Sequence, residues 1–362
     1  MGKVLGVLII VIILVILTFM LLRYFLKNNT LRKSQNAIKE GGIAELVELH
    51  VNGTKQFIFI ESKSTDRPII LFLHGGPGQP IPFGVSSRGV YPDLAENFIA
   101  VYYDQRGAGK SYHKDIPIET MNVHQFVDDT KQIIDYLTER FDQDMIYLSG
   151  MSWGSIIGMK IVEEHPEKIK GYFGISQFVN NAENQRLSTE WLWDIAVKKN
   201  DKKLKEDLAS FGEPPYTIEK EEKFSKYISQ FGGDNYSDEK VKKANILNYV
   251  KPIFISPDYT LKDIYSVLVS GAKFSLFTAK ELQKEIQQEV DLQTIRRVYS
   301  PIYIFQGKHD KLTNYDLSLD FYNQLEVQGD KEFITLENSA HYPNEEDFKI
   351  IIEKMINVSK RK

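Results

Sequence analysis

The sequence predicts an α/β fold in which a mostly parallel sheet carries helices on both faces, and three observations support this prediction. Short strand-like runs alternate with helical patterns along most of the chain. One long interval, from about residue 177 to 299, is charged, aromatic and helix-like without a convincing strand. A charge-free stretch lies near the amino terminus. We therefore expect an α/β core that holds an inserted helical domain and follows one transmembrane helix.

The strand-like runs begin after a polar stretch near residue 42. In order they read LVELHV, KQFIFI, IILFLH, FIAVYY, MIYLSG, GYFGIS, PIYIFQG and EFITLEN. The first two are separated by Asn52-Gly53, a dipeptide typical of a two-residue hairpin turn. The later runs are separated by helical patterns such as VHQFVDDTKQIIDYLTERF, which favour parallel strands joined by helices.

The same patterns divide the chain into four predicted parts. Residues 1–27 form a membrane anchor, and the polar residues 28–42 form a linker that ends at two glycines. Residues 43–180 and 295–362 form the α/β core, and residues 181–294 form the inserted helical domain, which the family resemblance described below identifies as a cap.

The anchor prediction depends on residues 4–22, which are nineteen positions without a charge. As a helix they span roughly 28 Å, about the hydrocarbon thickness of a bilayer. No small-residue cleavage site follows them, so we expect an uncleaved single span, with a cleaved signal peptide as the alternative. Basic residues are more frequent after the span than before it, which favours a cytoplasmic catalytic domain, whereas the lack of cysteine weakly favours the opposite side.

Composition excludes several classes of protein. The 362 residues include no cysteine, which excludes disulfides, thiolate catalysis, zinc fingers and iron–sulfur clusters. Residues 1–40 hold six Lys or Arg and one Glu, a net +5, and the remainder holds 39 basic and 48 acidic residues, a net −9. An acidic soluble part is a poor nucleic-acid binder, so we expect no nucleic-acid partner.

Residues typical of catalytic sites follow five of the strand-like runs. These segments are HGGPG, DQRGAGKS, the turn at Ser152, GKHD and NSAHYP. In a parallel sheet, ligands bind beyond the carboxyl ends of the strands, so these loops should meet at one edge.

Ser152 is the predicted nucleophile. It is the serine of a G-x-S-x-G pattern, Gly150 to Gly154, placed between a strand-like run and a helical one. In such a turn the serine is strained and exposed, and the glycines relieve crowding by neighbouring backbone. A structural turn would be the better interpretation of an isolated match, but the strand before and the helix after favour a nucleophile.

The partners of Ser152 follow from the chain order of serine, acid and histidine in this arrangement. His341 is predicted as the base, because it lies well after Ser152 in the sequence and an acidic residue at the end of a different strand comes between them. Asp310 follows a strand directly and is predicted as the acid, whereas Asp316 and Asp320 fall in the next helical pattern.

The oxyanion that forms on attack needs preorganised donors. We predict the backbone amides of Trp153, after the nucleophile, and of Gly76 in HGGPG, where Gly75 and Gly76 let the backbone approach the substrate closely. HGGPG lacks the Lys-Ser/Thr ending of a phosphate-binding loop. Asp104 and Arg106 are interpreted as structural residues that tie the DQRG turn together by a charged hydrogen bond, without touching substrate.

Together these motifs resemble the proline iminopeptidases of the α/β-hydrolase superfamily, over about residues 45–180 and 295–360. The resemblance implies an α/β-hydrolase fold, a cap over the active site, and release of an amino-terminal residue, preferentially proline, with no metal or other cofactor. In that family acidic cap residues hold the substrate's free amine, which points to Glu183. The sequence departs from the family pattern at Met151 and in its membrane anchor.

Three functions from different classes stay open at this level. The first is a membrane-anchored serine aminopeptidase acting on short peptides or amino-acid amides. The second is a carboxylesterase or related acyl hydrolase with the same triad, because fold and triad do not fix the leaving group. The third is a non-catalytic sensor, which would not need all three triad groups. An epoxide hydrolase or dehalogenase would require Asp at position 152.

Overall fold

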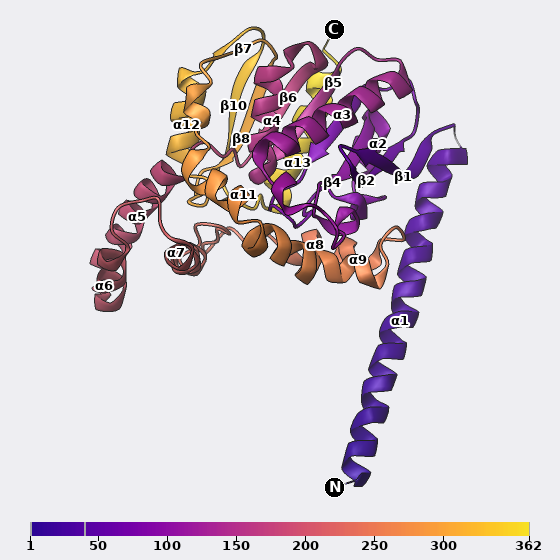
Figure 1. The fold of residues 1–362 in the computed structure, drawn as a ribbon, viewed down its shortest axis with the longest axis horizontal. Helices are drawn as coiled ribbons and strands as arrows, with labels where there is room; N and C mark the ends of the chain where they lie inside the picture. The colour runs from indigo at the N-terminus through magenta and orange to yellow at the C-terminus, as the bar shows by residue number, and fades with distance from the viewer. Residues whose placement is uncertain (1, 40, 362) are drawn as a thin grey trace.

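The chain folds around an eight-stranded sheet, seen in a computed structural model that describes residues 2–39 and 41–361 (Figure 1). The strand order is β1-β2-β4-β3-β5-β6-β8-β10. β2 is antiparallel to both β1 and β4, and all neighbours from β4 to β10 are parallel. The strands are β1 Ile43–Val51, β2 Thr54–Ser62, β3 Ile69–Leu73, β4 Ile99–Asp104, β5 Ile146–Met151, β6 Ile169–Ile175, β8 Ile302–Gly307 and β10 Lys331–Leu336. The mostly parallel sheet is therefore confirmed.

The hairpin predicted at Asn52-Gly53 is present. These two residues join β1 to β2 with φ values of 42° and 79°. Positive φ at both central positions matches the twist of the flanking strands, which is why Asn followed by Gly is favoured there.

Helices cover both faces of the sheet. On β3, Ile69, Leu71 and Leu73 belong to one fully buried core, and Ile70 and Phe72 belong to the other. Helices α3, α4 and α12 supply side chains to the first core, and α2 and α13 supply the second. A strand buried on both faces reads as a continuous apolar run, which explains the pattern IILFL. The bounds are α2 Pro92–Asn97, α3 Val123–Phe141, α4 Trp153–Glu164, α12 Tyr315–Gln324 and α13 Glu345–Ser359.

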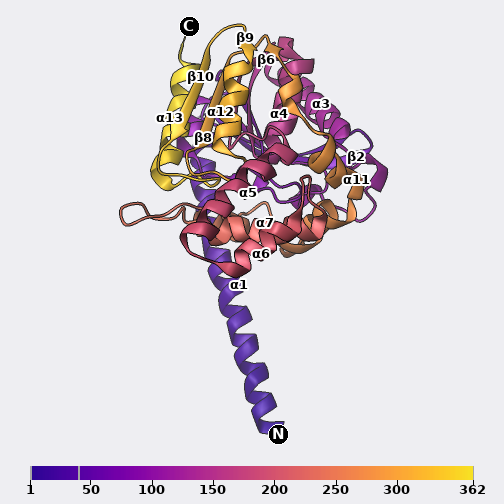
Figure 2. The same cartoon turned by 90° about the vertical axis from the view of Figure 1, so that its left-hand side faces the viewer.

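The interval between β6 and β8 is helical, apart from the two-residue strand β7 at its end. Its helices lie beyond the carboxyl ends of the parallel strands, on the lower side of the molecule (Figures 1 and 2). Between α9 and the end of this run, three π-helical turns alternate with short α-helical pieces. The bounds are α5 Asn181–Lys198, α6 Lys202–Phe211, α7 Ile218–Gln230, α8 Ile246–Ile255, α9 Leu261–Tyr265, α10 Gly271–Lys273 and α11 Lys280–Lys284, with π-turns at Ser266–Ser270, Phe274–Thr278 and Glu285–Glu289. β7 Arg297–Val298 pairs with β9 Glu326–Val327.

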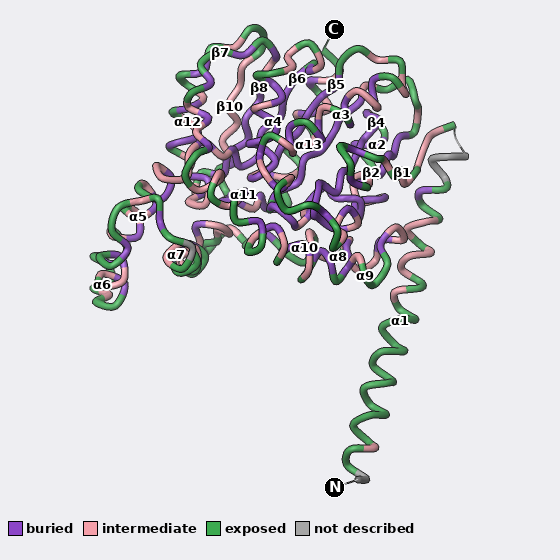
Figure 3. The backbone as a smooth tube through the Cα atoms, in the orientation of Figure 1, coloured by how far each residue is buried: buried purple, intermediate pink, exposed green. Residues whose placement is uncertain are grey.

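The amino-terminal helix α1 is longer than the predicted anchor. It runs from Gly2 to Lys39 and projects from the lower side of the molecule, exposed along its first half (Figure 3). Most of the predicted linker 28–42 is thus helical, and residue 40 of that segment lies outside the described residues. Residues 28–39 contain no glycine or proline, and Ser34 is buried against β2 through a hydrogen bond to Glu61 (3.3 Å). Polar composition alone therefore did not end the helix.

The DQRG turn is held differently from our prediction. Arg106 does not pair with Asp104 but forms a fully buried two-point ion pair with Asp129 on α3, with N···O distances of 2.7 and 2.9 Å. Asp104 instead accepts hydrogen bonds from the amide of Lys110 (2.8 Å) and the hydroxyl of Tyr259 (2.7 Å). The two side chains point to different elements, so the turn is tied to α3 and to the helical segment separately.

The buried ion pair provides a stability test. Asp129→Asn should lower the free energy of unfolding by about 3 to 5 kcal/mol, because it leaves the Arg106 guanidinium buried without its counter-ion. The matched control is Asp128→Asn, whose side chain is 51% exposed and which should change the stability by less than about 0.5 kcal/mol. Urea unfolding of the detergent-solubilised protein measures both, and equal effects of the two substitutions would contradict a dominant role for the pair.

Candidate active site

Ser152 occupies a strained turn between β5 and α4. Its φ of 52° and ψ of −117° are unusual for a residue with a side chain, and its amide donates to the Ile175 carbonyl on β6 (3.0 Å). A Cβ on Gly154 would lie 2.2 Å from the carbonyl oxygen of Leu73, and one on Gly150 would lie 2.5 Å from that of Gly154. The glycines of the pattern are therefore required by close backbone packing around the serine.

The three residues predicted as a triad lie in one hydrogen-bonded chain. His341 Nε2 is 3.1 Å from Ser152 Oγ, and His341 Nδ1 is 3.1 Å from Asp310 Oδ2. His341 is 3% exposed and Asp310 is fully buried. The residues come from loops after β5, β8 and β10, which are separated in sequence but end at the same edge of the sheet.

Asp310 is surrounded by donors that keep a buried carboxylate satisfied. The amides of Leu312 (2.8 Å) and Thr313 (2.9 Å) donate to Oδ1. The Thr313 hydroxyl (2.8 Å) and the Gln306 side-chain amide (3.0 Å) donate to Oδ2, the oxygen that faces His341. Sequence reasoning missed Gln306 and Thr313, although both flank the GKHD segment and hydroxyl or amide residues next to a buried acid are a usable signal.

The HGGPG loop lies against the nucleophile. A Cβ built on Gly75 would be 3.5 Å from the Ser152 Cβ, and Gly76, with φ of 118°, lines the same cavity as Ser152 and Trp153. The structure thus brings the predicted oxyanion residues beside the serine. Only a residue without a side chain adopts the Gly76 conformation readily.

His74, which sequence reasoning did not assign, positions this loop. Its Nδ1–H donates to the Gly75 carbonyl (2.6 Å), and its Nε2 accepts from the amide of Gln105 (3.1 Å). The Gln105 side chain donates to the His74 carbonyl (3.0 Å) and accepts from the Trp153 indole (2.8 Å). One donor and one acceptor nitrogen require a neutral ring, in agreement with burial, which lowers the pKa of His74 to about 4.

A cavity of about 180 Å³ adjoins Ser152. It is smaller than the roughly 300 to 1,000 Å³ of sites for drug-sized ligands, so it suits a group the size of one residue. Its apolar lining comes from core and helical segment alike, and Glu221 of α7 is the acidic residue among the described residues that line it. The apolar residues of the lining are Trp153, Ile156, Phe178, Phe224, Ile286 and Leu312.

Glu221 is half-buried, and among the described residues no cation is a hydrogen-bond partner of its carboxylate. Its carboxylate accepts from the side-chain amide of Gln185 and from the hydroxyl of Ser225 (3.4 Å). Burial raises the pKa of Glu221, because removal from water penalises the charged form. A half-buried carboxylate in the same cavity as Ser152 is suited to a cationic group of a ligand.

Glu183 does not lie in this cavity, which corrects the prediction from the sequence. Its carboxylate pairs with Arg186 (2.6 Å) and lines a different hollow of about 620 Å³. On α5, Asn181 and Asn184 face Ser152, and the 3.6-residue period turns Glu183 away from them. Arg186 also pairs with Glu190 (2.6 Å), so the other acid near the start of the insertion is likewise engaged at the surface.

A groove of about 510 Å³ adjoins the Ser152 cavity. The two share Glu221 and Ser225, and the groove continues between α7 and the π-helical segment, where Leu276 and Phe277 line it. The groove and the Ser152 cavity are therefore neighbours on either side of Glu221 and Ser225.

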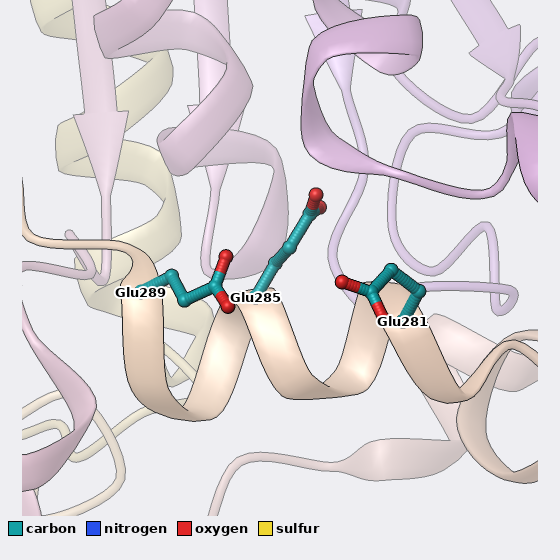
Figure 4. Close-up of side chains that lie close together, drawn as sticks. All are labelled: Glu281, Glu285 and Glu289. Atoms are coloured by element: carbon teal, nitrogen blue, oxygen red, sulfur yellow. The ribbon is translucent and has the colours of Figure 1, made fainter.

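Three glutamates form a cluster on α11 and the following π-turn (Figure 4). Each has a partner within the protein: Glu285 accepts from the Val123 amide at the start of α3 (2.6 Å), and Glu281 and Glu289 pair with Lys284. These contacts account for the cluster as a structural feature, and we assign no metal to it.

Comparison with known proteins agrees with this fold. Residues 68–348 match the family described as alpha/beta hydrolase fold. The chain is 29% identical over 305 residues to the probable aminopeptidase YbaC of Bacillus subtilis (strain 168), covering 84% of this chain and 93% of that protein. It is 33% identical over 126 residues to the proline iminopeptidase of Neisseria gonorrhoeae, covering 34% and 37% of the two chains. The crystal structure of a proline iminopeptidase-related protein from Thermus thermophilus superposes with a TM-score of 0.52 at 17% identity, covering 88% and 97%.

The neutral His74 predicts a pH dependence of stability. Its pKa is about 4 when folded and about 6.5 when unfolded, so the unfolded chain binds the extra proton and stability is lost as the pH falls through this window. The loss between pH 7 and pH 5 should be smaller by about 2 kcal/mol in His74→Asn than in the unsubstituted protein. Urea unfolding at the two pH values in detergent measures the difference. His124→Asn, an 81% exposed side chain, is the control, and the same pH dependence in both variants would contradict the assignment.

Proposed function

Because the chain belongs to the alpha/beta hydrolase fold family, we propose that it is a membrane-anchored serine aminopeptidase that releases the first residue of short peptides. The observation that carries the proposal is the hydrogen-bonded chain Ser152–His341–Asp310, which opens on a residue-sized cavity containing Glu221. The similarity to a probable aminopeptidase over most of both chains supports it. Proline iminopeptidase activity is the specific form we favour.

The proposed reaction starts with proton transfer from Ser152 Oγ to His341 Nε2 as the oxygen attacks the scissile carbonyl. Asp310 accepts the Nδ1 proton of His341 in a hydrogen bond, which fixes the tautomer and stabilises the imidazolium that forms. The amides of Trp153 and Gly76 donate to the oxyanion. His341 then protonates the leaving amine, and water, activated by the same base, hydrolyses the acyl-enzyme. No step requires a metal or another cofactor.

Glu221 replaces Glu183 as the proposed partner of the substrate's free amine. Its cavity also contains the nucleophile, and its burial makes an incoming ammonium group favourable for the carboxylate. A substrate with a blocked amine would leave Glu221 without that cation.

A carboxylesterase is the alternative function. The apolar walls around Ser152, from Ile156 and Phe178 to Leu312, suit the acyl chain of an ester, and the triad would act in the same way. A sensor without catalysis remains the weaker proposal, because all three triad groups are present and hydrogen-bonded.

We also propose that residues 181–294 act as a cap and that α1 acts as a membrane anchor. Residues 181–294 contribute Asn181, Glu221 and Phe224 to the walls of the Ser152 cavity, which supports their role as a cap on the core 43–180 and 295–362. The apolar part of α1 has a mean hydropathy of 3.4 in a helix long enough to cross a bilayer, a property that the alternative, a cleaved signal peptide, would share. The charge distribution favours a single-pass anchor with a cytoplasmic catalytic domain.

Ser152→Ala tests the nucleophile. The substitution should abolish both turnover and labelling by a fluorophosphonate probe while leaving the fold intact, because only a base-activated serine is phosphonylated. His341→Ala and Asp310→Asn should each lower kcat by several orders of magnitude without adding to the effect of Ser152→Ala, since the three act as a unit. Ser155→Ala, a neighbouring serine on α4, is the control, and labelling that survives in Ser152→Ala would refute the assignment.

Glu221→Gln tests the amine site against the esterase alternative. With prolyl arylamide the variant should show a KM raised about tenfold or more and a smaller change in kcat, because the carboxylate acts in binding. The matched control is Glu219→Gln, an exposed side chain of the same helix that lines neither the groove nor the Ser152 cavity and should leave KM unchanged. N-acetylprolyl arylamide should be a poor substrate of the unsubstituted enzyme. Turnover of p-nitrophenyl acetate or butyrate with none of the unblocked arylamide would favour the esterase.

A further inference from the structure

The helical segment exposes a group of large apolar side chains. They come from α8, α9 and the π-helical turns up to residue 278, and their exposed fractions run from 40% to 72%. We call this set the cap face, and it consists of Ile246, Leu247, Leu261, Tyr265, Leu268, Val269 and Phe277. Large apolar side chains exposed in such number within one segment of a chain are typical of a contact surface.

The exposed charged side chains of the same segment are all basic. Residues 246–280 contain four lysines, all exposed, and no glutamate. The two aspartates of the segment are both engaged: Asp258 pairs with Arg88 (2.6 Å) and Asp263 with Lys110 (3.0 Å), with side chains 8% and 14% exposed. The segment therefore presents apolar groups together with cations, within a chain whose net charge is −4. The exposed lysines are Lys251, Lys262, Lys273 and Lys280.

The part of the cap face around α8 and α9 lies beside the point on α1 where the apolar stretch ends. Arg23 is the first charged residue after the apolar stretch 4–22. Its guanidinium donates to the carbonyls of Phe254 (2.9 Å) and Tyr259 (2.6 Å), at the end of α8 and just before α9. Figures 1 and 2 show the apolar half of α1 extending away from the domain on the side where α8 and α9 lie. The end of the apolar stretch and the cap face therefore share one level.

We infer that the cap face docks on the surface of the bilayer that α1 spans, with its apolar side chains among the lipid headgroups and its lysines next to anionic ones. The inference rests on the proposed membrane anchor, because α1 fixes which side of the domain meets the lipid. The combination of Leu, Phe and Tyr with surrounding Lys is the composition of interfacial helices. Anionic headgroups attract each lysine within a Debye length of the surface.

Docking has a consequence for access to Ser152. Phe277 belongs to the cap face and also lines the groove that shares Glu221 and Ser225 with the Ser152 cavity. The mouth of the groove is thereby placed at the lipid surface, so the enzyme takes substrates that partition into the headgroup region, such as peptides carrying an apolar tail.

The lack of cysteine in the chain allows a direct test with single-cysteine variants of the full-length protein. Leu261→Cys, Leu268→Cys and Phe277→Cys are labelled with an environment-sensitive fluorophore and reconstituted into vesicles of phosphatidylcholine and phosphatidylglycerol containing spin-labelled lipid. Docking predicts that lipid quenches at least two of these labels about threefold more than control labels, because the positions lie within the headgroup layer. The controls are Met145→Cys and Tyr299→Cys, exposed positions before β5 and β8 at the opposite edge of the sheet.

Leu14→Cys in α1 separates failure of the inference from failure of the anchor. Quenching at Leu14 with none at the three cap positions would overturn docking while keeping the anchor, and no quenching at Leu14 would overturn both. Crosslinking of Leu268→Cys to a second copy without lipid quenching would assign the cap face to a dimer and likewise overturn the inference. Unchanged thermal melting of each variant shows that the fold is retained, as expected for exposed positions.

Discussion

Three backbone segments, the ends of β3 and β5 and the start of α4, approach one another closely around Ser152. The rest of the site depends on this packing. Gly154 is packed so tightly on the carbonyl of Leu73 that no Cβ fits, and this contact presses the first turn of α4 against β3. Ser152 is left with a positive φ and its side chain beyond the end of the sheet. The strain is offset by the buried cores on both faces of the central strands, which hold β3 and β5 in register.

Buried polar contacts extend from this turn to the periphery. His74 and Gln105 connect the oxyanion loop with the Trp153 indole, and Asp104, the residue before Gln105, accepts from the Tyr259 hydroxyl. The Tyr259 carbonyl in turn accepts from Arg23 of α1. Burial raises the pKa of Asp104 to about 7. The loops around Ser152 and the amino-terminal helix are thus parts of one hydrogen-bonded structure.

Much of the molecule could be predicted from local sequence patterns. The eight strands of the sheet, the hairpin at Asn52-Gly53 and the helical insertion were evident, because strands buried on both faces read as apolar runs. Ser152, Asp310 and His341 could be selected because each follows a strand and parallel strands end at a common edge. The predictions failed where the direction of a side chain mattered: Arg106 pairs with Asp129, and Glu183 faces Arg186.

The sequence by itself determined the order of strands and helices, the strained serine turn and which residues follow the strands, since these depend on short-range periodicity and backbone sterics. Only the tertiary structure decided which acid of the helical segment faces Ser152. Glu221 is held there by Gln185 of a different helix, and the direction of each helix face depends on packing between residues far apart in the chain. The same holds for α1, whose polar second half stays helical because Ser34 and Arg23 find partners on β2 and beside α9.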